Sequence, residues 1–204
     1  MKNFIEVGKT EDEQEQQIKK WLKDNVPQII AGITLGLGGI WGLDTYKVYQ
    51  SQQSIDARAL YLQTAFNNDS NTFEQLNTDH ANSGYAQQAT LMLAKAAAKS
   101  GNYTQALSQL TPLVNDENSL LANIANMRIA SIQLEMGNFK AAIDTLDSKE
   151  SGEFNGLYNQ LKGDIYVADN QIDQAKTHYK LALTQISRDS ELQSLINIKL
   201  ADLN

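Results

Sequence analysis

Acid–base or metal chemistry in this chain would depend first on its two histidines, His80 and His178. His80 stands in a polar stretch typical of a turn, and neither histidine has a companion at metal-ligand spacing. The chain has no cysteine, which excludes disulfides, thiolate nucleophiles and the commoner structural zinc sites. We therefore expect both histidines to be ordinary surface or interhelix residues.

Neighbouring carboxylates occur at Asp116-Glu117 and in the run Glu11-Asp12-Glu13. Hydrolysis of a glycosidic bond needs two carboxylates that face each other across a cleft, which residues adjacent in a turn do not provide. The glycines form no phosphate-binding loop of the GxxxxGK[ST] type. We find no catalytic constellation, and we expect a protein that is not an enzyme and has no metal or cofactor.

Residues 26–43 are eighteen consecutive residues without a charge. As a helix they would reach roughly 27 Å, close to the ~30 Å hydrocarbon core of a bilayer. Trp21 and Trp41 would lie near the two interfaces, where such rings are enriched. The sequence predicts a tail over residues 1–25, a single transmembrane helix over 26–43 and a folded domain over 44–204.

Two other interpretations of the apolar segment are weaker. A buried core helix is usually amphipathic, whereas this segment would carry apolar and glycine residues on all its faces. A cleaved signal peptide needs a small-x-small site close behind its apolar run. The only candidate, Ala57-Arg58-Ala59, lies fourteen residues beyond Leu43.

Positive charges flank the segment unevenly. Lys19, Lys20 and Lys23 precede it, whereas only Lys47 and the more distant Arg58 follow. Because positive charges near a span stay on the cytoplasmic side, we expect a cytoplasmic tail and a domain on the far side. In a bacterium the far side of the inner membrane is the periplasm.

Five glycines lie inside the predicted span. Gly32, Gly36 and Gly39 share one helical stripe, and Gly38 with Gly42 forms a second pair. Such stripes let helix backbones approach closely in lipid, so we expect lateral docking on another membrane protein. The alternative is that glycine is simply common in membrane helices.

A motif recurs in the domain. Residues 101–107, 137–143 and, more weakly, 170–176 align at spacings of 36 and 33 residues, close to the 34 of a tetratricopeptide repeat. Each copy has a turn residue, with a small residue seven positions before it and an alanine five positions after it, where paired helices would cross most closely. The sequence thus predicts an all-α fold, a tetratricopeptide-like α-solenoid behind one transmembrane helix, with packing residues Ala94, Gly101, Ala106, Ala130, Gly137, Ala142, Gly163 and Ala175.

Further helices are expected on both sides of the repeats. Residues 55–62 read as a continuation of the membrane helix, and residues 71–77 as a short second helix. Asp189 or Ser190 would cap a last amphipathic helix that seals the stack. Residues 67–70 and 148–153 read as loops.

Aromatic residues recur in the repeats, and most should pack between helices. Tyr166 and Tyr158 are our candidates for lining a groove that binds an extended or helical peptide. The net charge of −7 argues against nucleic acid as a partner.

The order of tail, single span and degenerate repeats resembles the YfgM family, ancillary subunits of the bacterial SecYEG translocon. The likeness is carried by residues 18–25 before the glycine-rich helix, by 126–130, by 141–147 and by 198–203 at the end of the chain. One departure is Asn170, where the repeat pattern prefers glycine, so we expect a third turn that is less tightly packed or differently angled.

The resemblance implies an inner-membrane protein whose periplasmic domain lies near the translocon exit and associates with the periplasmic chaperone PpiD. Family members are thought to help pass emerging secretory proteins to periplasmic chaperones, and none has catalytic residues to transfer. Two rival hypotheses remain open: a periplasmic scaffold for cell-envelope assembly, and an envelope-stress regulator that acts through the cytoplasmic tail.

Overall fold

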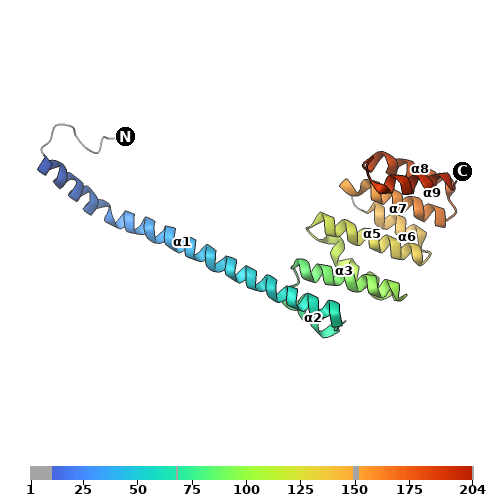
Figure 1. Ribbon diagram of the computed structural model, residues 1–204, viewed down its shortest axis with the longest axis horizontal. Helices are drawn as coiled ribbons and strands as arrows, with labels where there is room; N and C mark the ends of the chain where they lie inside the picture. The colour runs from blue at the N-terminus through green and yellow to red at the C-terminus, as the bar shows by residue number, and fades with distance from the viewer. Residues whose placement is uncertain (1–10, 68, 149–151, 204) are drawn as a thin grey trace. The chain divides into compact units, whose positions relative to one another are not determined.

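The computed structural model describes residues 11–67, 69–148 and 152–203, and the regular structure of these residues is entirely helical (Figure 1). This confirms the predicted all-α class. The chain divides into two compact units, residues 1–56 and residues 57–204, which we describe separately. The folded repeat unit thus begins at residue 57, later than the predicted start of the domain at residue 44.

The first unit consists, in its described part, of one helix. Helix α1 spans Glu11–Asn67 and continues without interruption into the second unit, so the helix predicted over residues 55–62 is confirmed. The predicted span of residues 26–43 lies within α1, and Pro27 stands inside the helix. Within the described residues, α1 is the one helix long and apolar enough to cross a bilayer, and its apolar window is exposed in the first unit.

The second unit is a stack of three antiparallel helix pairs (Figure 1). Within each pair the two helices pack along their length, and the second helix of one pair contacts the first helix of the next. An amphipathic hairpin cannot bury its apolar side alone, so each pair is stabilised by its neighbours. The pairs are α3 (Gly84–Lys99) with α4 (Tyr103–Leu110), α5 (Ser119–Glu135) with α6 (Phe139–Asp147), and α7 (Asn155–Ala168) with α8 (Ile172–Gln185).

The three turns inside these pairs have one backbone geometry. Gly101 and Gly137 have φ of 75° and Asn170 has φ of 58°, all in the left-handed region. In each turn the residue after this position donates to a carbonyl five residues back: Asn102 N to Ala97 O at 2.9 Å, Asn138 N to Gln133 O at 2.8 Å, and Gln171 N to Tyr166 O at 2.8 Å. These are Schellman caps. The backbone of the third turn is therefore equivalent to the other two, contrary to our expectation, because asparagine tolerates the left-handed conformation.

Short elements complete the second unit. Helix α2 (Ser70–Asp79) packs through Leu76 on Ala57 of α1 and on Ala86 and Ala89 of α3. The 3₁₀ helix η1 (Thr111–Asn115) joins α4 to α5, and η2 (Gly152–Phe154) precedes α7. Of the two predicted loops, residues 68 and 149–151 lie outside the described residues.

The last helix, α9 (Glu191–Ala201), packs on α8. The Ser190 hydroxyl accepts a hydrogen bond from Leu192 N at 3.3 Å, which confirms the predicted cap. Ile196 is fully buried against Ala182 and Tyr179 of α8, so α9 covers the end of the stack.

Candidate protein-binding surfaces

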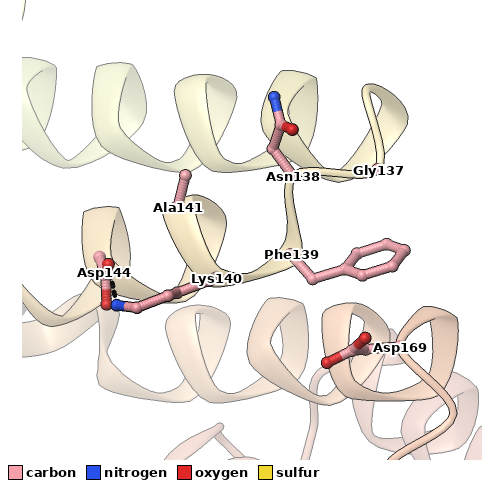
Figure 2. A pocket seen from close by; sticks show the side chains of 7 residues that line it. All are labelled: Gly137, Asn138, Phe139, Lys140, Ala141, Asp144 and Asp169. Atoms are coloured by element: carbon pink, nitrogen blue, oxygen red, sulfur yellow. Dashed lines mark hydrogen bonds and ion pairs between the residues drawn. The ribbon is translucent and has the colours of Figure 1, made fainter.

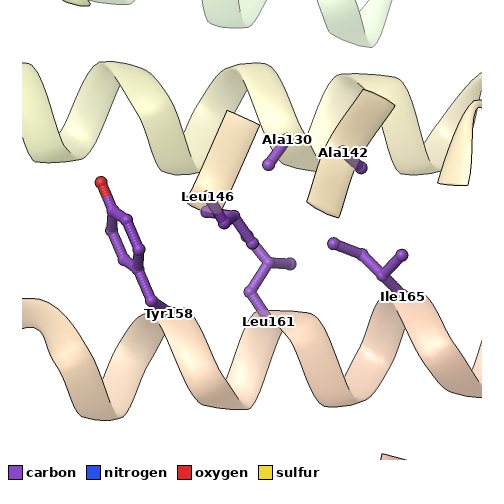
Figure 3. Packing of buried hydrophobic residues seen from close by; sticks show 6 residues of the cluster. All are labelled: Ala130, Ala142, Leu146, Tyr158, Leu161 and Ile165. Atoms are coloured by element: carbon purple, nitrogen blue, oxygen red, sulfur yellow. The ribbon is translucent and has the colours of Figure 1, made fainter. Parts of the chain in front are cut away.

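The small residues selected from the repeat pattern lie where the paired helices meet. Ala94, Ala106, Ala130, Ala142 and Ala175 are almost completely buried. Between the second and third pairs, Ala130 of α5 and Ala142 and Leu146 of α6 pack against Leu161 and Ile165 of α7 in one apolar layer (Figure 3).

Gly163 lies at a close crossing between α7 and α8. A Cβ placed on Gly163 would collide with the ring of Tyr179. Any larger residue would therefore force the two helices apart or displace the ring.

Tyr158 does not line a groove, which corrects our prediction. Its side chain is only 2% exposed, and its hydroxyl donates to Asn123 Oδ1 at 2.8 Å. Burial raises the pKa of this phenol. The residue stands on α7, where residues of α5 and α6 cover it, and its ring joins the layer of Figure 3.

Tyr166 is half-buried and stacks on His178. The two ring centroids are 5.1 Å apart and the ring planes differ by 18°. His178 Nδ1 lies 2.8 Å from Asn159 Oδ1, and burial, aided by the positive charge of Lys162, lowers the pKa of the imidazole. Burial thus disfavours the charged imidazole, and His178 is an interhelix residue, as we expected.

Asp164 connects three helices at the end of the stack. Its carboxylate accepts a hydrogen bond from the Tyr179 hydroxyl on α8 at 2.6 Å and forms an ion pair with Lys199 on α9 at 2.6 Å. Gln160 Nε2 adds a third donor at 2.6 Å. Burial and the neighbouring carboxylate together raise the pKa of Tyr179. This network fixes helix α9, and the three donors already occupy the carboxylate of Asp164.

Two of the sequence candidates for chemistry, Asp116 and His80, take part in local hydrogen bonds. Asp116 accepts from Gln87 Nε2 at 2.9 Å and from Asn118 N at 2.8 Å. The backbone N–H of His80 donates to Leu76 O at 3.0 Å, where His80 terminates α2. Across the described ranges, no three His, Asp or Glu side chains gather as metal ligands.

A polar hollow opens beside the second turn (Figure 2). Gly137, Asn138 and Phe139 line it together with Asp169, which belongs to the third turn. Its one cation, Lys140, already pairs with Asp144 at 2.7 Å, and both side chains are well exposed. The hollow also contains the carboxylate of Asp169, which accepts a hydrogen bond from Gln171 Nε2.

The glycines of the predicted span are free of contacts within their own unit. A Cβ placed on Gly32, Gly36, Gly38, Gly39 or Gly42 would have no other atom within 4 Å. Large apolar side chains such as Leu35, Ile40 and Trp41 are likewise exposed. A helix of this kind buries its surface in lipid or against another membrane helix.

Comparison with known proteins places this architecture in a family. The model of a tetratricopeptide repeat-like domain matches residues 19–204. A protein of Aggregatibacter actinomycetemcomitans named ancillary SecYEG translocon subunit is 30% identical over 95% of this chain and 98% of its own length. This chain belongs to the family of ancillary SecYEG translocon subunits.

Relatives from other bacteria have the same name. The relative from Haemophilus influenzae is also 30% identical over 95% of this chain and 98% of its own length. The relative from Escherichia coli is 22% identical over 86% of this chain and 88% of its own length. No solved structure matches the chain significantly.

Two interactions of this family member were missed by reasoning from sequence. The Asp164–Lys199 pair joins residues 35 positions apart on α7 and α9, and Arg128 on α5 donates from Nη1 to Leu91 O on α3 at 2.7 Å. The only sequence signal for either was a charged residue inside an otherwise apolar helix pattern.

Proposed function

We propose that this protein is a membrane-anchored, non-enzymatic adaptor at the SecYEG translocon. The observation that carries the proposal is the near full-length similarity to relatives named ancillary SecYEG translocon subunits. The exposed apolar part of α1 supports anchoring in the inner membrane.

The adaptor would help transfer emerging secretory proteins to periplasmic chaperones. Repeat stacks of this kind bind polypeptides along their surfaces, and the described residues hold no metal-ligand cluster. The lysines before residue 26 favour a cytoplasmic tail and a periplasmic repeat unit. PpiD is the partner chaperone implied by the resemblance.

The glycine stripe is our candidate for the contact with the translocon. Gly32, Gly36 and Gly39 would allow a neighbouring helix to approach the backbone of α1 inside the bilayer, where close packing drives association. Other positions of the helix carry large exposed apolar side chains, such as that of Leu37. A partner helix can therefore approach the backbone more closely at the glycine stripe than at these positions.

Photo-crosslinking inside the membrane tests this proposal. A photoreactive amino acid at Gly39 should capture translocon subunits after irradiation of intact cells and isolation in detergent. The same amino acid at Leu37, on the opposite side of the helix, is the matched control and should capture them weakly. Capture of cell-wall, division or outer-membrane assembly proteins instead would favour the envelope-scaffold alternative, and capture of no translocon subunit at either position would refute the proposal.

A further inference from the structure

A cavity of about 270 Å³ lies between α3 and α5 on the repeat unit, and it combines apolar residues with two cations. Small-molecule sites usually measure about 300–1,000 Å³, so this one suits one or two side chains of a polypeptide better than a separate ligand. It is lined by Ala94, Lys95, Ala98, Leu110, Arg128, Ser131 and Ile132.

The two cations have no carboxylate partner within the described residues. Arg128 makes one hydrogen bond, from Nη1 to Leu91 O at 2.7 Å, which leaves its other N–H groups without a protein acceptor in the described ranges. Lys95 is exposed and takes part in none of the ion pairs of the described chain.

The Arg128 side chain is half-buried, and this burial lowers the pKa of its guanidinium. A charge in such a position gains most from an anion that can accept two of its N–H groups, and a carboxylate has this geometry. Ala94, Leu110 and Ile132 belong to the buried core and form the apolar floor of the cavity beside it. The ligand that fits both features has an anionic group next to an apolar one.

We propose that this cavity binds a carboxylate side chain of a partner polypeptide, with an adjacent apolar side chain entering between α3 and α5. The two positive charges of the cavity favour an acidic segment of the partner. This positive charge is confined to the cavity, since the chain as a whole carries a net charge of −7. The inference deepens the proposed adaptor function and rests on it for the view that the repeat unit binds polypeptides.

Peptide binding to the full-length protein in detergent micelles tests the site. The probe is a fluorescent peptide of alternating Leu and Glu residues, with a matched peptide of Leu and Gln as the neutral control. Fluorescence anisotropy should show binding of the acidic peptide that is at least about tenfold tighter than binding of the neutral one, as expected for hydrogen bonds to charged groups.

Two variants and a control locate the binding. Lys95→Glu and Arg128→Gln should each weaken binding of the acidic peptide about tenfold, whereas Lys180→Glu, which changes an exposed lysine on α8, should alter it less than about twofold. Arg128→Gln removes the donor to Leu91 O and can disturb folding, so Lys95→Glu, with an exposed side chain, is the decisive variant.

Several results would overturn the inference. The first two are equal affinities for the two peptides and no binding of the acidic peptide by the unaltered protein. A third is an equal loss of affinity for the acidic peptide in Lys95→Glu and Lys180→Glu. The fourth is displacement of the peptide by millimolar inorganic phosphate, which would indicate a general anion site. Capture of translocon subunits from Gly39 in the Lys95→Glu variant separates failure of this site from failure of the adaptor function. If capture persists while peptide selectivity is absent, only the site is refuted.

Discussion

Lys199 on α9 donates two hydrogen bonds to the carboxylate of Asp164 on α7, at 2.6 Å and 2.8 Å. The Tyr179 hydroxyl on α8 donates to the same carboxylate at 2.6 Å. One acidic side chain therefore connects the last three helices of the stack, and the position of the closing helix depends on it.

Replacement of Asp164 by alanine should loosen the end of the solenoid. The change leaves the ammonium of Lys199 and the hydroxyl of Tyr179 without their acceptor in a partly buried site, which should lower the free energy of unfolding by about 1–3 kcal/mol. Hydrogen exchange should show α9 amides losing protection first. The matched control is Lys140→Ala, which breaks an exposed pair and should cost less than about 0.5 kcal/mol. Unchanged protection of α9 in Asp164→Ala would contradict this account.

The left-handed turns predict opposite responses at equivalent positions. Gly101→Ala forces a Cβ into a conformation with φ of 75° and should destabilise the protein by about 1–2 kcal/mol. Asn170→Gly removes such a penalty at φ of 58° and should leave stability unchanged or raise it slightly. Denaturant unfolding of both variants measures the difference, and a stability loss in Asn170→Gly as large as that in Gly101→Ala would be inconsistent with the shared geometry.

The crossing of α7 and α8 gives a third prediction. Gly163→Ala places a methyl group against the ring of Tyr179, whose hydroxyl is already fixed by Asp164, so we expect a loss of about 1–3 kcal/mol from overpacking. Gly84→Ala is the control, since a Cβ there meets no other atom within 4 Å. The Tm of thermal unfolding should therefore be lower in Gly163→Ala than in the unaltered protein. In Gly84→Ala the Tm should be unchanged or higher.

The pH dependence of stability should report His178. Burial lowers the pKa of its imidazole below the ordinary 6.5, so the unfolded chain binds this proton more readily than the folded one. The contribution of His178 to stability is therefore complete above about pH 7 and is lost as the pH falls below 6.5. In His178→Gln the free energy of unfolding should fall less between pH 7.5 and pH 5.5 than in the unaltered protein. An equal or steeper fall in the variant would show that His178 is not responsible.

The repeat pattern predicted the course of the backbone well, but it did not predict which neighbours surround a single side chain. The spacing of Gly101, Gly137 and Asn170 located all three turns, because a left-handed residue at a helix end depends on local sequence. Tyr158 was misplaced, since helical spacing assigns a residue to a helix without showing which neighbouring helix covers it. The Asp164–Lys199 pair was missed because nothing periodic connects two charges on α7 and α9.

Cysteine accessibility tests the central claim, that one helix anchors a periplasmic repeat unit, most directly. The chain has no native cysteine, so the single variants Glu15→Cys, before the span, and Ser148→Cys, at an exposed position after α6, each report one location. In cells with a permeabilised outer membrane, a maleimide that does not cross the inner membrane should label Ser148→Cys at once and Glu15→Cys only after lysis. Labelling of Glu15→Cys in intact cells, or protection of Ser148→Cys, would contradict the account.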